Sequence, residues 1–295
     1  MTRLDLLAVE FEGQRPHLKS VAYRMLGSLT EADDAVQEAW LRLARTDTGE
    51  IGNLPGWLTT VVSRLCLDML RTRTARREES LEVHLPDPVV GRDDATDPEQ
   101  QVLLADSLGL ALQVVLAELA PPERLAFVLH DIFGLPFEQI APIVDRTPVA
   151  AKKLASRARQ RIRAAAPSPD SDPGGQRRVI DAFQRAARDG DFDALLSILD
   201  PDVVLGVDGG VLTGGLQILR GAATVAAQAA NFQRMATAAV AYPVRINGTS
   251  GLINTIDGEL RSVTSFTVTG GRIVGIQILS DPERLSRLEL AELIG

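Results

Sequence analysis

Hydrophobic positions in the first half of the chain recur at helical spacing. Between residues 30 and 43 they fall three or four positions apart. They are Ala32, Ala35, Val36, Ala39, Trp40 and Leu43. After an LPGW turn, a second stripe at the same spacing runs through residues 57–73. It consists of Leu58, Val61, Val62, Leu65 and Met69. We expect an amphipathic helix in each region, the first capped by Thr30 with Asp33.

A longer helical pattern lies between residues 122 and 163. Pro122 opens an expected helix that Gly134 ends, and PFEQIAPIV follows as a short helix with a kink at Pro142. DRT then makes a turn, and a long helix starts at Pro148 with Thr147 as its cap. This order predicts a helix-turn-helix.

The long helix has an apolar face and a basic face. Its inward positions are Ala151, Leu154, Ala155, Ala158 and Ile162. Its outward positions include Lys152, Lys153, Ser156, Arg157, Arg159 and Arg163. Such a helix fits the major groove of DNA, where long side chains reach bases and phosphates. A solvated basic helix in a bundle is the alternative interpretation.

The last third of the chain has a different pattern. Helices are expected near 177–189, 192–199 and 220–235. Runs rich in Thr, Val and Ile, with Gly and Asn at the turns, predict strands near 202–208, 238–247, 251–257, 261–269 and 272–279. This mixture indicates an α+β domain.

Two segments rich in proline and aspartate divide the chain, at 84–98 and 166–175, and the second is expected to be mobile. The predicted organisation is a helical domain over 1–80, an acidic Pro-rich linker over 81–100, a second helical domain over 101–166, a flexible linker over 167–175 and an α+β domain over 176–295.

Charge and composition narrow the function. Acidic residues outnumber basic ones by 39 to 31, yet residues 146–166 hold seven basic residues and no acid. Local charge decides whether phosphate is attracted, so the total charge does not exclude nucleic acid. The single cysteine, Cys66, forms no intrachain disulfide. No membrane span or signal peptide is expected, and we interpret the chain as cytoplasmic.

Two further surfaces are candidates for binding. Arginines on the 57–73 helix and beyond it could follow a phosphate backbone, and Trp57 could stack on an unpaired base, although a tryptophan is more often core. These arginines are Arg64, Arg71, Arg73, Arg76 and Arg77. Opposite the Trp40 stripe, the 30–43 helix carries Asp33, Asp34, Gln37 and Glu38. Chemistry alone favours a solvated acidic face there, and the alternative is a docking face for a basic partner.

Taken in order, these pieces resemble a bacterial sigma factor of the extracytoplasmic-function group over residues 10–166. The helix that docks on RNA polymerase core is resembled by TEADDAVQEAW. The helix that reads and melts the −10 element is resembled by WLTTVVSRLCLDMLR. The domain that reads the −35 element is resembled by PPERLAFVLHDIFGLPFEQIAPIV together with TPVAAKKLASRARQRIR. Leu65 stands where many members have asparagine.

The resemblance implies a role for each set of residues. It implies docking on the clamp helices of polymerase core for Asp33, Asp34, Gln37 and Glu38, and it implies the polymerase flap as a further core partner of the chain. It implies −10 contacts for Trp57, Arg64, Arg71 and Arg73. It implies −35 contacts for Thr147, Lys152, Lys153, Ser156, Arg157 and Arg159.

The resemblance extends to one subgroup, in which a cone-shaped SnoaL-like domain with a curved mixed sheet follows the sigma domains. Residues 176–295 resemble that domain. The segment HLPDPVV resembles the subgroup's linker motif, with His84 in place of tryptophan. The sequence DGG at 208–210 resembles the Asp-Gly-Gly loop of the subgroup. The residues implied in interdomain regulation are Leu85, Pro86, Asp87, Pro88, Asp208, Gly209 and Gly210. The resemblance implies that the attached domain replaces a separate anti-sigma protein.

No enzyme chemistry is evident in the sequence. Residues 176–295 lack histidine, and Asp200, Asp202 and Asp208 each have a turn explanation. His17, His84 and His130 are isolated, so neither a metal nor a cofactor is expected. A cone-shaped domain could still bind a small apolar ligand.

We therefore expect a promoter-specificity subunit whose partners are polymerase core and promoter DNA. Two alternatives are a DNA-binding regulator with a ligand-binding domain and a SnoaL-type enzyme with a DNA-binding appendage.

Overall fold

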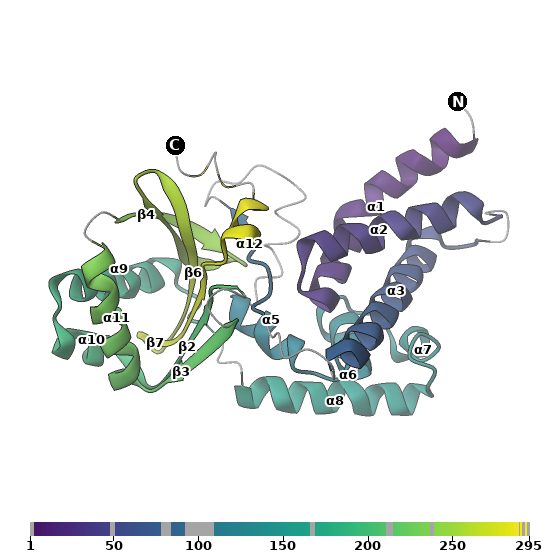
Figure 1. The fold of residues 1–295 in the computed structure, drawn as a ribbon. Helices are drawn as coiled ribbons and strands as arrows, with labels where there is room; N and C mark the ends of the chain where they lie inside the picture. The colour runs from purple at the N-terminus through teal and green to yellow at the C-terminus, as the bar shows by residue number, and fades with distance from the viewer. Residues whose placement is uncertain are drawn as a thin grey trace. The chain divides into compact units, whose positions relative to one another are not determined.

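The computed structural model describes residues 3–47, 51–77, 84–91, 109–165, 169–210, 215–236, 239–288, 290 and 293. These residues form two compact units. The helical unit contains α1–α3, α6–α8 and the end of α5, and the sheet unit contains residues 84–91, the start of α5 and the elements from α9 onward (Figure 1). Both predicted helical domains therefore belong to one unit.

Among the described residues, the helical unit contains six whole helices, the end of a seventh (α5) and one π-helical turn. Its elements are α1 (Arg3–Leu26), α2 (Leu29–Arg45), α3 (Leu54–Arg77), α5 (Gly109–Ala117), α6 (Pro121–Phe127), the π-helical turn η2 (Val128–Ile132), α7 (Phe137–Ile140) and α8 (Pro148–Ala165).

Helix α2 follows its sequence pattern but begins earlier than expected. The predicted positions Ala32, Ala35, Val36, Ala39 and Leu43 are buried. The predicted cap was wrong: Ser28 is the N-cap, and its hydroxyl accepts a hydrogen bond from the Glu31 amide at 3.4 Å. Trp40 is half-buried, with its ring centroid 5.2 Å from that of Phe11.

The buried face of α3 differs in part from the predicted stripe. Leu58 and Val62 are buried as expected, whereas the other three predicted positions are only half-buried. The remaining buried positions are Thr59, Ser63, Cys66, Leu67 and Leu70. Polar side chains therefore belong to this face, which a purely apolar pattern cannot reveal.

The sheet unit is an α+β domain with one mixed, curved sheet (Figure 1). Its helices are α9 (Pro173–Asp189), α10 (Phe192–Ile198), α11 (Ala222–Ala236) and α12 (Pro282–Ser286). Its strands are β1 (Val90–Gly91), β2 (Leu199–Asp208), β3 (Leu216–Arg220), β4 (Ala239–Ile246), β5 (Thr249–Ile256), β6 (Glu259–Thr269) and β7 (Arg272–Leu279). The strand order is β1-β4-β5-β6-β7-β2-β3, with β2 and β7 parallel and the other pairs antiparallel.

Alternation along the strands gives this sheet two apolar faces. Helices α9–α11 cover one face, where Leu252, Phe266 and Ile276 are buried. On the other face, Ile253 and Val263 pack with Leu285 of α12. The sequence pattern missed β1, β3 and α12, which have two, five and five residues.

Both expected linkers are partly built into the sheet unit. In the first, β1 pairs with β4, so the described residues 84–91 are not a free spacer. In the second, the Asp170 carboxylate accepts hydrogen bonds from the Gly270 and Gly271 amides at 2.9 and 3.0 Å. Helix α9 begins at Pro173 with Asp172 as its N-cap, three residues before the predicted domain start. The described part of this segment is therefore anchored, contrary to the expected mobility.

Candidate functional site

Helix α8 and the turn before it form the predicted helix-turn-helix. Helix α7 ends at Ile140, just before Pro142, and a turn with Asp145 at φ +53° leads into α8. The Thr147 hydroxyl accepts a hydrogen bond from the Ala150 amide at 3.3 Å, which confirms the predicted cap. The buried positions of α8 are Ala151, Ala155 and Ala158.

The opposite side of α8 presents the expected polar face. Lys152, Lys153, Ser156 and Arg157 are exposed. Two further arginines are held by acidic side chains of the same unit. The Nε atom of Arg159 lies 2.7 Å from Oδ1 of Asp131, and Nη1 of Arg161 lies 3.3 Å from Oε2 of Glu123.

The Asp131 carboxyl group is partly withdrawn from solvent. Burial raises the pKa of Asp131, and the nearby Arg159 and His130 oppose this shift without cancelling it. The His130 ring lies against Phe137, with centroids 3.9 Å apart. Asp131 and Arg159 thus form an ion pair between two elements of this domain, and the sequence pattern had not identified Asp131.

The candidate −10 arginines on α3 occupy different environments. Arg64 is exposed and donates a hydrogen bond from Nη2 to the Pro142 carbonyl at 3.2 Å. Arg71 is exposed and forms an ion pair with Asp68 at 3.3 Å. Trp57 is half-buried.

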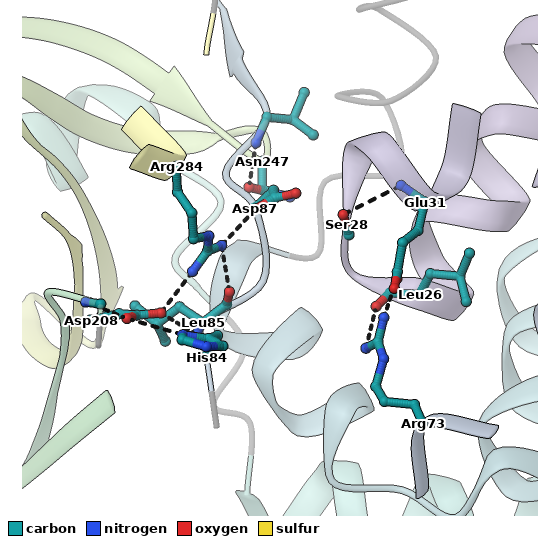
Figure 2. Close-up of polar contacts among 12 residues, drawn as sticks. Leu26, Ser28, Glu31, Arg73, His84, Leu85, Asp87, Asp208, Asn247 and Arg284 are labelled. Carbon is teal, nitrogen blue, oxygen red and sulfur yellow. Dashed lines mark hydrogen bonds and ion pairs between the residues drawn. The ribbon is translucent and has the colours of Figure 1, made fainter. Parts of the chain in front are cut away.

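Arg73 is bound inside the helical unit. Its guanidinium forms an ion pair with Glu31 and donates a hydrogen bond to the Leu26 carbonyl at 3.2 Å (Figure 2). In this structure Arg73 therefore ties α3 to the start of α2, which the arginine spacing alone does not reveal.

The acidic face of α2 is largely open to solvent. Asp34 and Gln37 are exposed. Asp33 forms an ion pair with Lys19 at 2.9 Å, and Glu38 forms one with Arg42 at 3.0 Å.

Buried polar contacts join the two predicted helical domains. Gln113 of α5 donates from Nε2 to the Tyr23 carbonyl at 2.9 Å, and Arg124 of α6 donates from Nε to the Arg24 carbonyl at 3.0 Å. Both donors satisfy carbonyls in the last turns of α1. Sequence reasoning missed these residues because their partners lie about 90 to 100 positions away.

The residues predicted for interdomain regulation meet within the sheet unit. Asp208 is fully buried and accepts hydrogen bonds from the Leu85 amide at 2.8 Å and from Nη1 of Arg284 at 2.7 Å. The same Arg284 donates from Nη2 to the Leu85 carbonyl at 2.7 Å and to the Asp87 carboxylate at 2.6 Å (Figure 2). His84 Nδ1 lies 3.5 Å from the Asp208 carboxylate. We call Asp208, Arg284 and Asp87 the linker anchor.

The rest of the 84–91 segment is also held in the sheet unit. The side-chain oxygen of Asn247 accepts a hydrogen bond from the Val89 backbone amide at 3.1 Å, and the Asn247 backbone amide donates to the Val89 carbonyl at 2.8 Å. Pro86, Pro88 and Gly209 are buried. Gly210 is buried at φ +75°, where a Cβ atom would approach the Asp281 carboxylate to 2.6 Å.

No His, Cys, Asp or Glu group in the described residues has the arrangement of a metal site. None of the described helices has the length and apolarity required to span a membrane.

The chain is similar to two family models and to several known proteins. Residues 11–76 match sigma-70 region 2, and residues 109–162 match sigma-70 region 4. The probable ECF RNA polymerase sigma factor SigI of Mycobacterium tuberculosis is 36% identical over 305 aligned positions, covering 100% of both chains. The ECF RNA polymerase sigma factor SigJ of M. tuberculosis is 47% identical over 196 residues, 66% of this chain and 62% of that protein. A crystal structure of M. tuberculosis SigJ matches with a TM-score of 0.75 at 34% identity, over 95% of this chain and 98% of that chain.

Proposed function

The chain belongs to the extracytoplasmic-function (ECF) RNA polymerase sigma factors, and from that premise we propose how its residues divide the work of promoter recognition. The fold class predicted from the sequence, helical sigma domains followed by a SnoaL-like α+β domain, is confirmed. As a sigma factor, the protein directs polymerase core to promoters and starts transcription there.

Recognition of the −35 element is assigned to α8, and its exposed face is the observation that carries this proposal. A capped helix that turns its alanines inward and its lysines outward suits the major groove. Lys152, Lys153, Ser156 and Arg157 are exposed, so they can contact bases or phosphates without a rearrangement of the fold.

Contact with the −10 element is assigned to the outer side of α3. Arg64 and Arg71 are exposed arginines of this helix and can pair with phosphates around melted DNA. Trp57, half-buried near the start of α3, is assigned a weaker role in stacking on an unpaired base. Arg73 supports α3 through Glu31 and reaches DNA only if that ion pair breaks.

Docking on polymerase core is assigned to the acidic face of α2. Asp34 and Gln37 are exposed, so a basic partner surface can approach them directly. Asp33 and Glu38 lie on the same face and already have basic partners in Lys19 and Arg42. If Asp33 or Glu38 exchanges its present basic partner for one on polymerase, the gain in free energy is small. Asp34 is therefore expected to contribute most to core binding.

Regulation is assigned to the sheet unit through the segment that it holds. Residues 84–91 lie in sequence between the two sigma domains, and only six residues separate α3 from this segment. While the linker anchor holds, the connection between the sigma domains is therefore shortened. We assign the sheet unit this restraining role in place of a separate anti-sigma protein, and we assign no bond chemistry to the chain.

Run-off transcription tests the proposed function. Purified polymerase core is incubated with genomic promoter fragments, with and without the full chain and with a chain truncated after residue 175. Promoter-specific transcripts that require the protein are the expected result, and truncation should alter their amount. Absence of transcripts with either form, together with unaided binding to duplex DNA, would instead indicate an ordinary DNA-binding regulator.

A further inference from the structure

Helix α8 is held at both borders of its exposed face by acidic side chains. Arg159 lies at one border against Asp131, and Arg161 lies at the other against Glu123. The two ion pairs look alike in sequence, since each joins an acid of the preceding helical segment to an arginine of α8. Their surroundings differ, however, and the difference suggests different tasks.

The Arg161 pair belongs to the packing of α8. Nη2 of Arg161 also donates to the Glu118 carbonyl at 3.0 Å, so the guanidinium bridges the Glu123 side chain and the backbone at Glu118. A guanidinium held at both Nη atoms has its terminal donors engaged. This arrangement engages the terminal donors that a base contact would need, although the side chain itself is 51% exposed.

Arg159 is held differently. Oδ1 of Asp131 lies 2.7 Å from Nε of Arg159, on the side of the planar group, in an ion pair rather than an aligned hydrogen bond. The two terminal amino groups lie at the other end of the fork. Arg159 follows Ser156 by three residues and Lys152 by seven, so helical geometry puts it on the same side as these exposed residues. Its side chain remains 36% exposed.

The folded environment of Asp131 favours the protonated form of its carboxyl group. Burial raises the pKa of Asp131 even with Arg159 beside it, which means that the folded environment disfavours the ionised form. Asp131 also lies in the π-helical turn η2, a geometry that occurs frequently at functional sites.

We propose that Asp131 is a positioning residue that orients Arg159 to read a guanine in the −35 element. The inference rests on the proposed function, and it adds a residue that does not itself touch DNA. Bidentate contact with guanine O6 and N7 requires the guanidinium to lie in the plane of the base. Asp131 supplies that restraint before DNA binds and so reduces the ordering required of the side chain on binding.

The test measures base preference with the complete holoenzyme. Full-length chain and polymerase core are incubated with a duplex library randomised across the −35 element, and bound DNA is sequenced. The variants are Asp131→Ala, Asp131→Asn, Asp131→Glu, Arg159→Ala, Arg157→Ala and the matched control Glu123→Gln.

We expect Arg159→Ala and Asp131→Ala each to lose a guanine preference of about tenfold at the same position. Asp131→Glu retains that preference because the carboxylate is kept, and Asp131→Asn weakens it at the same position. Glu123→Gln leaves every preference unchanged even if its melting temperature falls, since it disturbs only the packing pair. Melting curves of all variants accompany the selection.

The proposal is overturned if Asp131→Ala keeps the guanine preference, or if it weakens all positions equally as a structural residue would. It is also overturned if Arg159→Ala alters no position. One result would overturn only this inference. In that result, the wild-type holoenzyme selects a −35 sequence, Arg157→Ala changes the selected base at some position, and Asp131→Ala changes none. When the wild-type holoenzyme selects no sequence in this region, the proposed function fails with it.

Discussion

Arg64 of α3 and Pro142 of the helix-turn-helix are joined by a hydrogen bond of 3.2 Å, although the two segments are assigned to different promoter elements. The −10 and −35 elements lie about 25 base pairs apart, or roughly 85 Å at ~3.4 Å per base pair. Segments in direct contact cannot occupy both elements at once. On the proposed assignments, we therefore expect the packing between the two sigma domains to open when the promoter complex forms.

Weakening this packing should favour polymerase binding. Gln113 is buried and donates to the Tyr23 carbonyl, so Gln113→Ala leaves carbonyls of α1 without that donor, at a cost of about 1–3 kcal/mol. Because the cost falls on the closed arrangement, we expect affinity for core to rise by roughly five- to a hundredfold. Titration of labelled core with the variant measures this change.

The matched control is Gln139→Ala, which removes an exposed glutamine of α7. Its affinity for core should equal that of the wild type. A Gln113→Ala chain that folds but binds core no better would show that the closed packing does not oppose polymerase binding.

Charge reversal at Asp34 should weaken docking on core. Asp34 is exposed on α2, so Asp34→Lys removes an attractive charge and adds a repulsive one without disturbing packing. We expect the loss to appear mainly in the association rate and to shrink at high salt, because exposed charges are screened. Surface plasmon resonance on immobilised core at two ionic strengths measures both. Asp193→Lys, the same change on exposed α10, should bind as the wild type does.

The Cys66 thiol should be inert in the folded protein. Burial raises its pKa to about 12, with Arg124 only partly opposing the shift, so almost no thiolate exists at pH 8. Alkylation at pH 8 should therefore proceed at the rate at which the chain unfolds, and urea should accelerate it. Rapid stoichiometric labelling of the native chain would show that the Cys66 thiol is not buried and protonated as described.

The raised pKa of Cys66 makes the free energy of unfolding depend on pH in the alkaline range. An unfolded thiol with a pKa near 9.0 releases its proton before the buried one does. Above that pH the unfolded state binds fewer protons than the native state, so the free energy of unfolding falls as pH rises, by up to about 1.4 kcal/mol per pH unit. A Cys66→Ala chain should lack this contribution in urea titrations at pH 9 to 11.

The local pattern of the sequence was sufficient for several elements and misleading for others. Thr147 and Pro148 start α8 as predicted because both act on their own turn. The start of α2 was also readable, since Ser28 followed by Glu31 is a capping-box spacing that was overlooked in favour of Thr30.

Contacts between distant residues account for the remaining differences. Arg73 was expected on DNA because spacing places it on α3, but its ion pair with Glu31 depends on how α3 packs against α2. The strand at Val90–Gly91 is too short to show a pattern, and it exists because β4 offers an edge. Arg284 reaches Leu85 across 199 positions, which no local signal encodes.

Breaking the linker anchor should release the 84–91 segment from the sheet unit. Asp208 is fully buried and accepts from both Arg284 and the Leu85 amide, so Asp208→Ala leaves the Arg284 cation without its buried partner, at a cost of about 3 kcal/mol. If that cost falls on the docked state, exchange of the Leu85 amide should accelerate by roughly a hundredfold, as followed by hydrogen–deuterium exchange.

The same variant connects docking to transcription. Release of the segment lengthens the free connection between the sigma domains, so Asp208→Ala should change run-off transcript levels in the same direction as truncation after residue 175. Asp202→Ala, at an exposed position of the same strand, is the matched control and should change neither exchange nor transcription. Accelerated Leu85 exchange with unaltered transcript levels would separate docking from regulation and leave the sheet unit without the restraining role proposed for it.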